Sequence, residues 1–108
     1  MRRYASLRRR ADFARLRQRG RRLNTPNLTL YRGDPQPGDT LPLVGITVTK
    51  AIGKAVVRNK LRRRLAAIVN DALDGRPPMR LLVVPRPAAA ALDFAALRAD
   101  VTSAFGRL

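Results

Sequence analysis

The densest group of ligand-binding side chains in this sequence lies at residues 50–64. Eight of these fifteen residues are Lys, Arg or Asn, and none is acidic. The run follows a β-like segment and leads into a helix-like one. Because the helix dipole disfavours cations at a helix start, each of them costs roughly a few tenths of a kcal/mol there. Several such charges together indicate that an anionic partner compensates for the cost, so the chemistry expected of this run is anion binding.

The chain offers little for bond-breaking chemistry. It has no His, and all seven of its acids are Asp. General acid–base catalysis near neutral pH most often uses His, and two-metal catalysis needs convergent carboxylates. Asp71 and Asp74 are better explained as a solvated helix end, and Asp34 and Asp39 lie among Pro and Gly as typical turn residues. We therefore expect no catalytic residue, no metal site and no cofactor bound by the protein itself.

The net charge is the second strong feature. The chain has 23 Lys and Arg against 7 acids, a formal charge of +16 over 108 residues. Such an excess opposes compaction unless anions neutralise it, and phosphate backbones do so with release of counterions. Arg predominates over Lys, and its planar fork suits phosphates and stacks on bases. GC-rich codon usage explains the preference for Arg equally well, but it does not explain the net charge.

Length and composition predict one domain over residues 1–108, because 45% apolar residues suffice for one modest core. The absence of Cys excludes a disulfide framework and a thiolate metal site. No apolar run approaches the roughly 20 residues that span a bilayer, and the basic N-terminus lacks the apolar segment of a secretory signal. We therefore expect a cytoplasmic protein.

The N-terminal part is strongly basic. Residues 1–9 have little pattern, and we expect a flexible basic arm there. A short helix is predicted for residues 10–19, because Phe13 and Leu16 lie three apart and Gly20 can end the helix.

Two strands are predicted next. Residues 27–32 and 43–49 alternate apolar and polar side chains, and the Pro- and Gly-rich loop 33–39 between them predicts that they pair antiparallel. An extra short strand is predicted near residues 40–42. The face opposite the apolar one carries small polar groups and one aromatic ring, namely Thr29, Tyr31, Thr47 and Thr49.

The second half contains the longest predicted helix, at residues 54–73, whose apolar stripe is Val57, Leu61, Leu65, Ile68 and Ala72. A wholly apolar strand at residues 81–84 is expected to be central and covered on both faces. The last helix begins near Asp93 as its N-cap. Its core stripe is Phe94, Leu97, Val101, Ala104 and Phe105. The order α-β-β-(β)-α-β-α predicts a single-domain α+β fold, an α/β sandwich.

The basic helix, the basic N-terminal segment and the polar strand face could converge on one side. Such a cationic groove with a stacking platform is typical of proteins that hold single-stranded nucleic acid. Phe13 is expected in the core, whereas for Tyr31 a contact role and a structural role are equally supported. Because the chain lacks Trp, phosphate contacts should dominate and base specificity should be weak.

One run of this sequence is highly specific: residues 50–63 read KAIGKAVVRNKLRR. Further motifs accompany it from about residue 7 to the C-terminus. They are Asp12-Phe13 with Gly20 seven residues on, the strand ending in Tyr31, residues 44–50 (VGITVTK) and Arg86-Pro87. In these motifs, their order and their spacing, the sequence resembles the bacterial ribonuclease P protein subunit.

The resemblance implies a left-handed β–α–β crossover, although about 98% of parallel crossovers are right-handed. It also implies an accessory subunit of the endoribonuclease that removes the 5′ leader of precursor tRNA by magnesium-dependent hydrolysis. In that enzyme the RNA subunit is catalytic and holds the Mg²⁺, and one protein copy binds each RNA.

The resemblance further implies two sets of contact residues. The residues expected to bind the RNA subunit are Lys54, Arg58, Asn59, Lys60, Arg62 and Arg63. The residues expected to line a cleft for the single-stranded leader are Phe13, Arg17, Tyr31, Thr47, Thr49 and Lys50.

Two positions depart from the family pattern. Ala66 stands where the family usually carries another Arg, and Arg64 lies about 160° round the helix from it. Arg17 stands where the family tends to have a second aromatic residue, so the leader cleft should rely less on stacking and more on phosphate pairing.

The alternative class is a non-catalytic structural RNA-binding protein such as a small ribosomal protein. Composition alone does not separate the two classes, whereas the ordered motifs favour the first. A basic amphipathic membrane binder is disfavoured, because the core needs the helices' apolar stripes.

Overall fold

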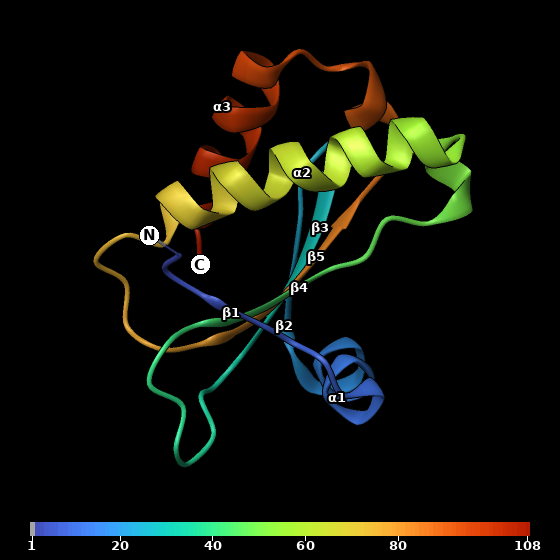
Figure 1. The fold of residues 1–108 in the computed structure, drawn as a ribbon. Coiled ribbons are helices and arrows are strands. Elements are labelled where there is room, and N and C mark those ends of the chain that lie inside the picture. Colours follow the sequence, from blue (N-terminus) through green and yellow to red (C-terminus); the bar gives the residue numbers. More distant parts are fainter. Residues whose placement is uncertain (1) are drawn as a thin grey trace.

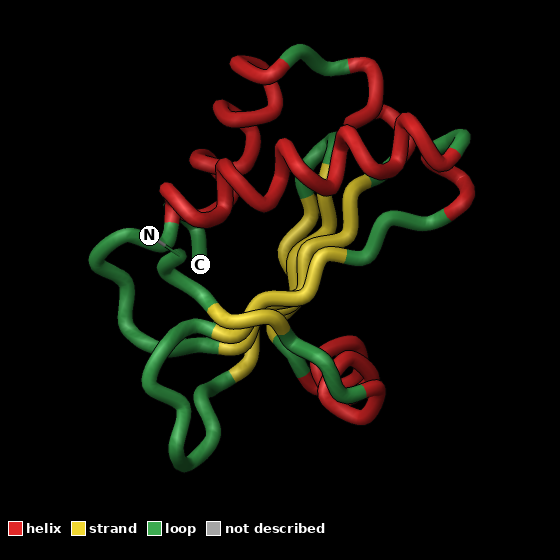
Figure 2. The backbone as a smooth tube through the Cα atoms, in the orientation of Figure 1, coloured by secondary structure: helices red, strands yellow, loops and turns green. Residues whose placement is uncertain are grey.

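Five strands form one mixed sheet in the order β1-β4-β5-β3-β2, with helices on both faces (Figures 1 and 2). The computed structural model describes residues 2–108. The strands are β1 Ala5–Ser6, β2 Arg21–Asn24, β3 Leu28–Gly33, β4 Leu43–Ile46 and β5 Arg80–Pro85. The helices are α1 Arg10–Arg19, α2 Ala55–Ala72 and α3 Phe94–Phe105, with two short 3₁₀ helices, η1 Lys50–Ile52 and η2 Pro87–Ala91. The predicted α+β class is confirmed.

The central strand is β5, as its wholly apolar sequence predicted. Leu81, Leu82 and Val83 are fully buried, and they contact layers on opposite faces of the sheet. β5 pairs antiparallel with β3 and parallel with β4. The predicted antiparallel pair of β3 and β4 is therefore wrong, because β5 lies between them. The loop between β3 and β4 is long enough to pass over β5, and an apolar strand gains most by burial on both faces.

Two edge strands escaped the sequence analysis. β2 pairs antiparallel with β3, and it begins with Arg21 and Arg22 directly after Gly20, the C-cap of α1. β1 pairs parallel with β4 at the other edge. Tyr4 and Leu7 are buried, so residues 4–7 are part of the domain and the predicted flexible arm over residues 1–9 is wrong for them. The predicted strand near residues 40–42 is absent, and Pro42 instead accepts a hydrogen bond from the Ala5 backbone.

The connection from β4 to β5 runs through η1 and α2, and so joins two adjacent parallel strands. This β–α–β unit confirms the predicted element order around the basic run. Its predicted left hand stays a prediction.

The main core lies between the sheet and the layer formed by α2 and α3. The predicted stripes are largely confirmed: Leu61, Leu65 and Ile68 of α2 meet Leu97 and the other buried residues of α3. Two predicted stripe residues at the first helical turns are exposed instead. Val57 and Phe94 are each 38% exposed.

The opposite face of the sheet carries only α1, at one end (Figure 1). Leu16 of α1, Leu7 and Leu82 form a small second core, with Phe13 and Tyr31 packed against it. Because α1 is short, the far end of this sheet face has no helix over it (Figure 2). None of the helices within residues 2–108 combines the length and apolarity that crossing a bilayer requires.

Candidate nucleic-acid interface

The basic run turns a sharp corner before it enters α2. η1 ends at Gly53, whose φ of 144° lies in the region that favours glycine, and α2 begins two residues later. Lys54 is the N-cap of α2 and makes no side-chain cap. The corner therefore leaves Lys50 and Lys54 exposed at the start of the helix, and neither charge is needed to hold the fold together.

The contact residues predicted on α2 lie on its outer surface. Asn59, Lys60, Arg62 and Arg63 are exposed, and Arg58 is half-buried. Arg62 donates a hydrogen bond of 2.9 Å from Nη1 to Asn59 Oδ1, so these two side chains act as one unit. Arg58 Nε is buried and has no hydrogen-bond partner within the described residues. A buried donor without an acceptor costs about 1–3 kcal/mol, so the guanidinium gains free energy if it turns toward an external acceptor.

The carboxylates of the protein do not neutralise this surface. Asp71 and Asp74 near the end of α2 form ion pairs with Arg3 and Arg98, not with the basic run. Asp12 and Asp39 form ion pairs with Arg80. Among residues 2–108, no ion pair involves a cation of the run 50–64, so its positive charge is fully available to an external anion.

The network around Arg80 is the most buried electrostatic feature. Arg80 Nε lies 3.0 Å from Asp39 Oδ2, and the Gln36 backbone N–H donates to the same oxygen at 2.8 Å. These hydrogen bonds, that of Arg80 first, lower the pKa of the Asp39 carboxyl below its usual range. The bond to Asp39 likewise raises the pKa of Arg80. No three carboxylate, His or Cys side chains in the described part of the chain are grouped so as to hold a metal ion.

Phe13 and Tyr31 lie on one sheet face, the face that carries α1. Tyr31 pairs with Leu82 across β3 and β5, and Gly45 pairs with the same Leu82 across β4, so the three form one row across the sheet. The Phe13 ring lies directly over Gly45: a Cβ built there would be 2.5 Å from Phe13 Cε1. Only glycine leaves room for the ring, which brings two of the predicted leader residues into one layer.

The remaining predicted leader residues are less closely gathered. Thr47 continues the strand beyond β4, where its backbone N–H donates to Val83, and it is half-buried. Thr49 and Lys50 follow on the exposed corner, and Arg17 is exposed one helical turn after Phe13. Arg17, Thr49 and Lys50 thus lie around the sheet face with their side chains exposed.

Two arginines of this face were missed as site residues. Arg86 donates to Asn24 Oδ1 at 3.0 Å and to Thr29 Oγ1 at 3.4 Å, and so ties β5 to the edge hairpin of β2 and β3. The guanidinium of Arg22 lies 5.9 Å from the centre of the Tyr31 ring. Arg86 could have been predicted as a site residue, because it directly follows the apolar central strand in the sequence. Arg22 could not, because β2 carries no apolar alternation strong enough to reveal it.

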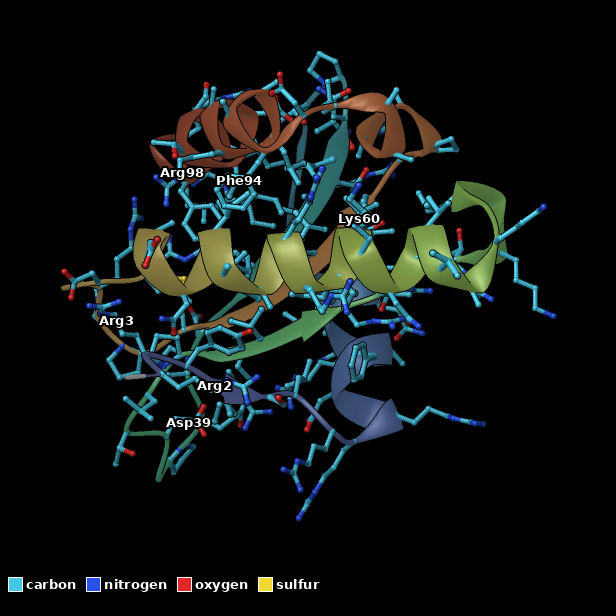
Figure 3. All side chains as sticks on the ribbon, turned by 45° about the horizontal axis from the view of Figure 1, so that its top comes forward. Arg2, Arg3, Asp39, Lys60, Phe94 and Arg98 are labelled. Carbon is cyan, nitrogen blue, oxygen red and sulfur yellow. The ribbon has the colours of Figure 1, made fainter. Side chains whose placement is uncertain are left out.

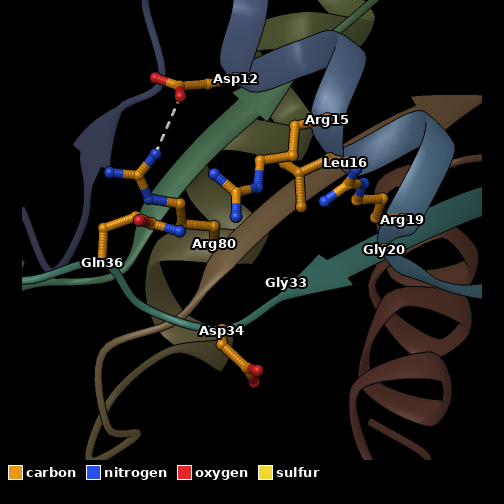
Figure 4. Close-up of a pocket in the computed structure, with 9 residues that line it drawn as sticks. All are labelled: Asp12, Arg15, Leu16, Arg19, Gly20, Gly33, Asp34, Gln36 and Arg80. Atoms are coloured by element: carbon orange, nitrogen blue, oxygen red, sulfur yellow. Dashed lines mark ion pairs between the residues drawn. The ribbon is translucent and has the colours of Figure 1, made fainter.

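Two of the hollows that flank α1 are relevant to the predicted contact residues. One, of about 170 Å³, lies on the side of the helix that carries Asp12, Arg15 and Arg19 (Figure 4), away from the predicted leader residues. The other, of about 260 Å³, lies between α1, the β1–β4 edge and α2. Its lining includes Phe13 of the predicted leader set and Arg62 of the predicted RNA-subunit set. The second hollow therefore joins the two predicted contact surfaces.

Comparisons with known proteins identify the family of this chain. The family model for ribonuclease P matches residues 1–108. The ribonuclease P protein components of Streptomyces bikiniensis and Thermobifida fusca are 44% and 41% identical to the chain over 110 and 105 residues. These alignments cover 94% and 91% of this chain and 89% and 71% of the two relatives.

Solved structures show the same fold. The RNase P protein of Staphylococcus aureus superposes with a TM-score of 0.87 at 20% identity, covering 94% of this chain and 93% of that one. The RNase P protein of Thermotoga maritima superposes with a TM-score of 0.80 at 26% identity, covering 95% of this chain and 96% of that one. With a family match over the whole sequence and relatives above 40% identity, the chain belongs to the ribonuclease P protein family.

Proposed function

We propose that this protein is the subunit of ribonuclease P that binds the catalytic RNA and the 5′ leader of precursor tRNA. The observation that carries the proposal is the unpaired cationic surface of α2 in a member of this family. It lies across the β1–β4 edge from the sheet face that carries Phe13 and Tyr31, and a hollow at that edge is lined by both Phe13 and Arg62. Two RNA segments that meet at the cleavage site could therefore be held by adjoining surfaces of one small domain.

The surface of α2 is the proposed contact with the RNA subunit. Lys54, Lys60 and Arg63 are exposed and supply charge, and the Asn59–Arg62 pair supplies a fixed donor group. Arg58 supplies the buried Nε that lacks an acceptor. Phosphate oxygens satisfy such donors with charge-assisted hydrogen bonds, which are about twice as strong as neutral ones.

The α1 face of the sheet is the proposed contact with the leader. Phe13 and Tyr31 offer partly exposed rings, and Thr47 offers a small polar group beside them. Arg17, Thr49 and Lys50 stand around this face as cations and hydroxyls suited to a phosphate backbone. Stacking and phosphate pairing of this kind tolerate any sequence, which suits leaders of unrelated sequence.

The hydrolysis itself is assigned to the RNA subunit and its Mg²⁺ ions. The side chains of this chain do not fit a catalytic metal site, because Asp12 and Asp39 are held by Arg80, and Asp71 and Asp74 by Arg3 and Arg98. The protein would act by positioning RNA and by neutralising phosphate charge, and so reduce the Mg²⁺ that the RNA needs to fold and to bind substrate.

Reconstitution tests this function. A bacterial ribonuclease P RNA should cleave precursor tRNA at a lower Mg²⁺ concentration when this protein is added, and the product should end at the mature 5′ terminus. Heat-unfolded protein serves as the control for unspecific charge. If a cognate RNA shows the same Mg²⁺ requirement with and without the folded protein, the proposed function is wrong.

A further inference from the structure

One flank of α2 carries a row of cations that stops at position 66, where the helix has Ala in place of a charged residue. Residues 58, 62 and 66 are spaced by four and therefore lie above one another, with a rise of about 6 Å between neighbours. Arg58 and Arg62 occupy the first two positions, and Ala66 occupies the third. Alanine contributes no charge, so α2 alone offers two guanidinium groups along this flank.

The N-terminal segment brings a third guanidinium to the same flank. Arg2 lines the 260 Å³ hollow together with Arg62 and Ala66. Arg2 and Ala66 also line a neighbouring shallow hollow with Tyr4 and Asn70. Figure 3 shows Arg2 next to β1, on the side of the C-terminal half of α2, and Lys60 on α2 further toward the N-terminus of the helix. Arg2 thus lies where a long side chain at position 66 would reach.

Arg2 is held in place without being neutralised. Its guanidinium lies 4.6 Å from the centre of the Tyr4 ring, and its Nη2 donates to Ser6 Oγ at 3.1 Å. Tyr4 is only 5% exposed, so the ring beneath Arg2 is part of the core. Arg2 is exposed, and within residues 2–108 it pairs with no carboxylate.

The residue after Arg2 fixes this segment to α2. The Arg3 backbone N–H donates to Asn70 Oδ1 at 2.7 Å, and Arg3 Nε lies 3.1 Å from Asp74 Oδ1. The same segment continues into β1, whose neighbour Leu7 donates to Val44. Arg3 thus forms ion pairs with both acids at the C-terminal end of α2, Asp71 and Asp74. The positive charge of Arg2 therefore stays available to an external anion.

We propose that Arg2 completes a row of three guanidinium groups, Arg58, Arg62 and Arg2, which binds successive phosphates of one RNA strand along this flank of α2. The inference rests on the proposed RNA-binding function and adds a residue to it. A stacked, preorganised guanidinium loses less freedom on binding than a mobile one, and it presents a planar fork to phosphate oxygens. The phosphates could come from the RNA subunit or from the leader.

The test uses the full-length protein and the variant Arg2→Gln, which removes the charge but keeps a planar group and a donor for Ser6. One arm measures binding to the ribonuclease P RNA alone over a range of salt. The other measures binding of precursor tRNA with a long or a one-nucleotide leader to the holoenzyme. Arg21→Gln is the matched control, because Arg21 is exposed on β2, at the sheet edge opposite β1.

Arg2→Gln should weaken binding about fivefold more than Arg21→Gln does, and should flatten the slope of log K against log salt by about 0.7–0.9. A loss in the first arm identifies the RNA subunit as the source of the phosphates, and a loss confined to long leaders identifies the leader. Arg2→Gln with Ala66→Arg should restore binding, because the new side chain reaches the same place.

Two results separate the inference from the function on which it rests. If the parent protein activates the RNA but Arg2→Gln equals Arg21→Gln in both arms, the role of Arg2 is refuted and the proposed function stands. If the parent protein itself does not lower the Mg²⁺ requirement, the function fails first. Equal melting temperatures of parent and variants show that any loss reflects binding and not unfolding.

Discussion

Arg80 on β5 forms an ion pair with Asp12 on α1, with 3.0 Å between Nη1 and Oδ1. The same guanidinium holds Asp39 of the loop between β3 and β4. One side chain of the central strand thereby fixes both the helix and the loop that lie at this end of the sheet. Because Phe13 directly follows Asp12, the ion pair also fixes the ring that lies over Gly45.

Replacing Arg80 should therefore destabilise the protein strongly. Arg80→Met keeps the apolar length but leaves two carboxylates, with side chains 25% and 10% exposed, without their cation. Removing one partner of a buried ion pair costs about 3–5 kcal/mol, and the partial exposure of Asp12 places the expected loss near the lower figure. Urea unfolding measures it. Arg107→Met, at an exposed position, should change the free energy of unfolding by less than about 0.5 kcal/mol. Similar losses in both variants would contradict the role of Arg80.

The stability should also depend on pH through Asp39. The folded-state pKa of this carboxyl is lowered, first by the Arg80 hydrogen bond and then by the Gln36 N–H. Its contribution is therefore complete above the ordinary value of 3.8 and is lost as the pH falls through the lower folded-state value. The free energy of unfolding should fall more steeply below about pH 4 for the parent than for Asp39→Asn. Asp34→Asn, in the exposed part of the same loop, should keep the slope of the parent. Parallel curves for the parent and Asp39→Asn would exclude this contribution.

The faces of the strands could be read from the sequence, whereas their neighbours could not. Alternation correctly placed Val44 in the main core and Gly45 on the opposite face. The pairing of β3 with β4 was predicted from their closeness in sequence. Strand pairing depends on which strand buries the most apolar surface at the centre of the sheet. The order of the strands is therefore a property of the assembled fold. For the same reason β1 could be recognised only by its partner β4, since two residues carry no periodicity.

The candidate site shows the same division. The exposed cations of α2 followed from helical spacing and from the absence of nearby acids in the sequence. The Asn59–Arg62 hydrogen bond, the buried Arg58 Nε and the position of Arg2 beside Ala66 depend on side-chain conformations and on contacts between distant segments. Such contacts have no signal in the local sequence, so only the structure could reveal them.

The close contact between Phe13 and Gly45 predicts a specific defect. In Gly45→Ala the new Cβ would lie 2.5 Å from Phe13 Cε1, so the ring must move. Overpacking of this kind costs about 1–3 kcal/mol. Leader binding by the reconstituted holoenzyme should weaken, because the displaced ring no longer keeps its place on the sheet face that it shares with Tyr31, whereas binding to the RNA subunit should stay unchanged. Both effects can be measured by urea unfolding and by titration of precursor tRNA.

A double-mutant cycle with Phe13→Ala tests the cause of this defect. Once the ring is removed, the added methyl group has space, so Gly45→Ala should cost much less stability in the Phe13→Ala background than in the parent. If Gly45→Ala lowers the free energy of unfolding equally in the two backgrounds, Gly45 is needed for a reason other than the space that it leaves for the Phe13 ring.

The proposed division of labour between α2 and the sheet face predicts opposite phenotypes for two variants. Arg58→Ala with Arg62→Ala should weaken assembly with the RNA subunit, and each lost phosphate contact should flatten the salt dependence by about 0.9. Tyr31→Ala should leave assembly and its salt slope unchanged but weaken binding of precursor tRNA, by about 1–3 kcal/mol if one base stacks on the ring. Filter binding over a salt series, first with the RNA alone and then with substrate and holoenzyme, distinguishes the two. An unchanged salt slope in the double variant would rule out α2 as the RNA-subunit contact. A loss of assembly in Tyr31→Ala would instead place the RNA subunit on the sheet face. Tyr31 and the pair Arg58 and Arg62 of α2 lie on opposite faces of the sheet. An RNA strand that binds both would therefore have to cross the β4 edge.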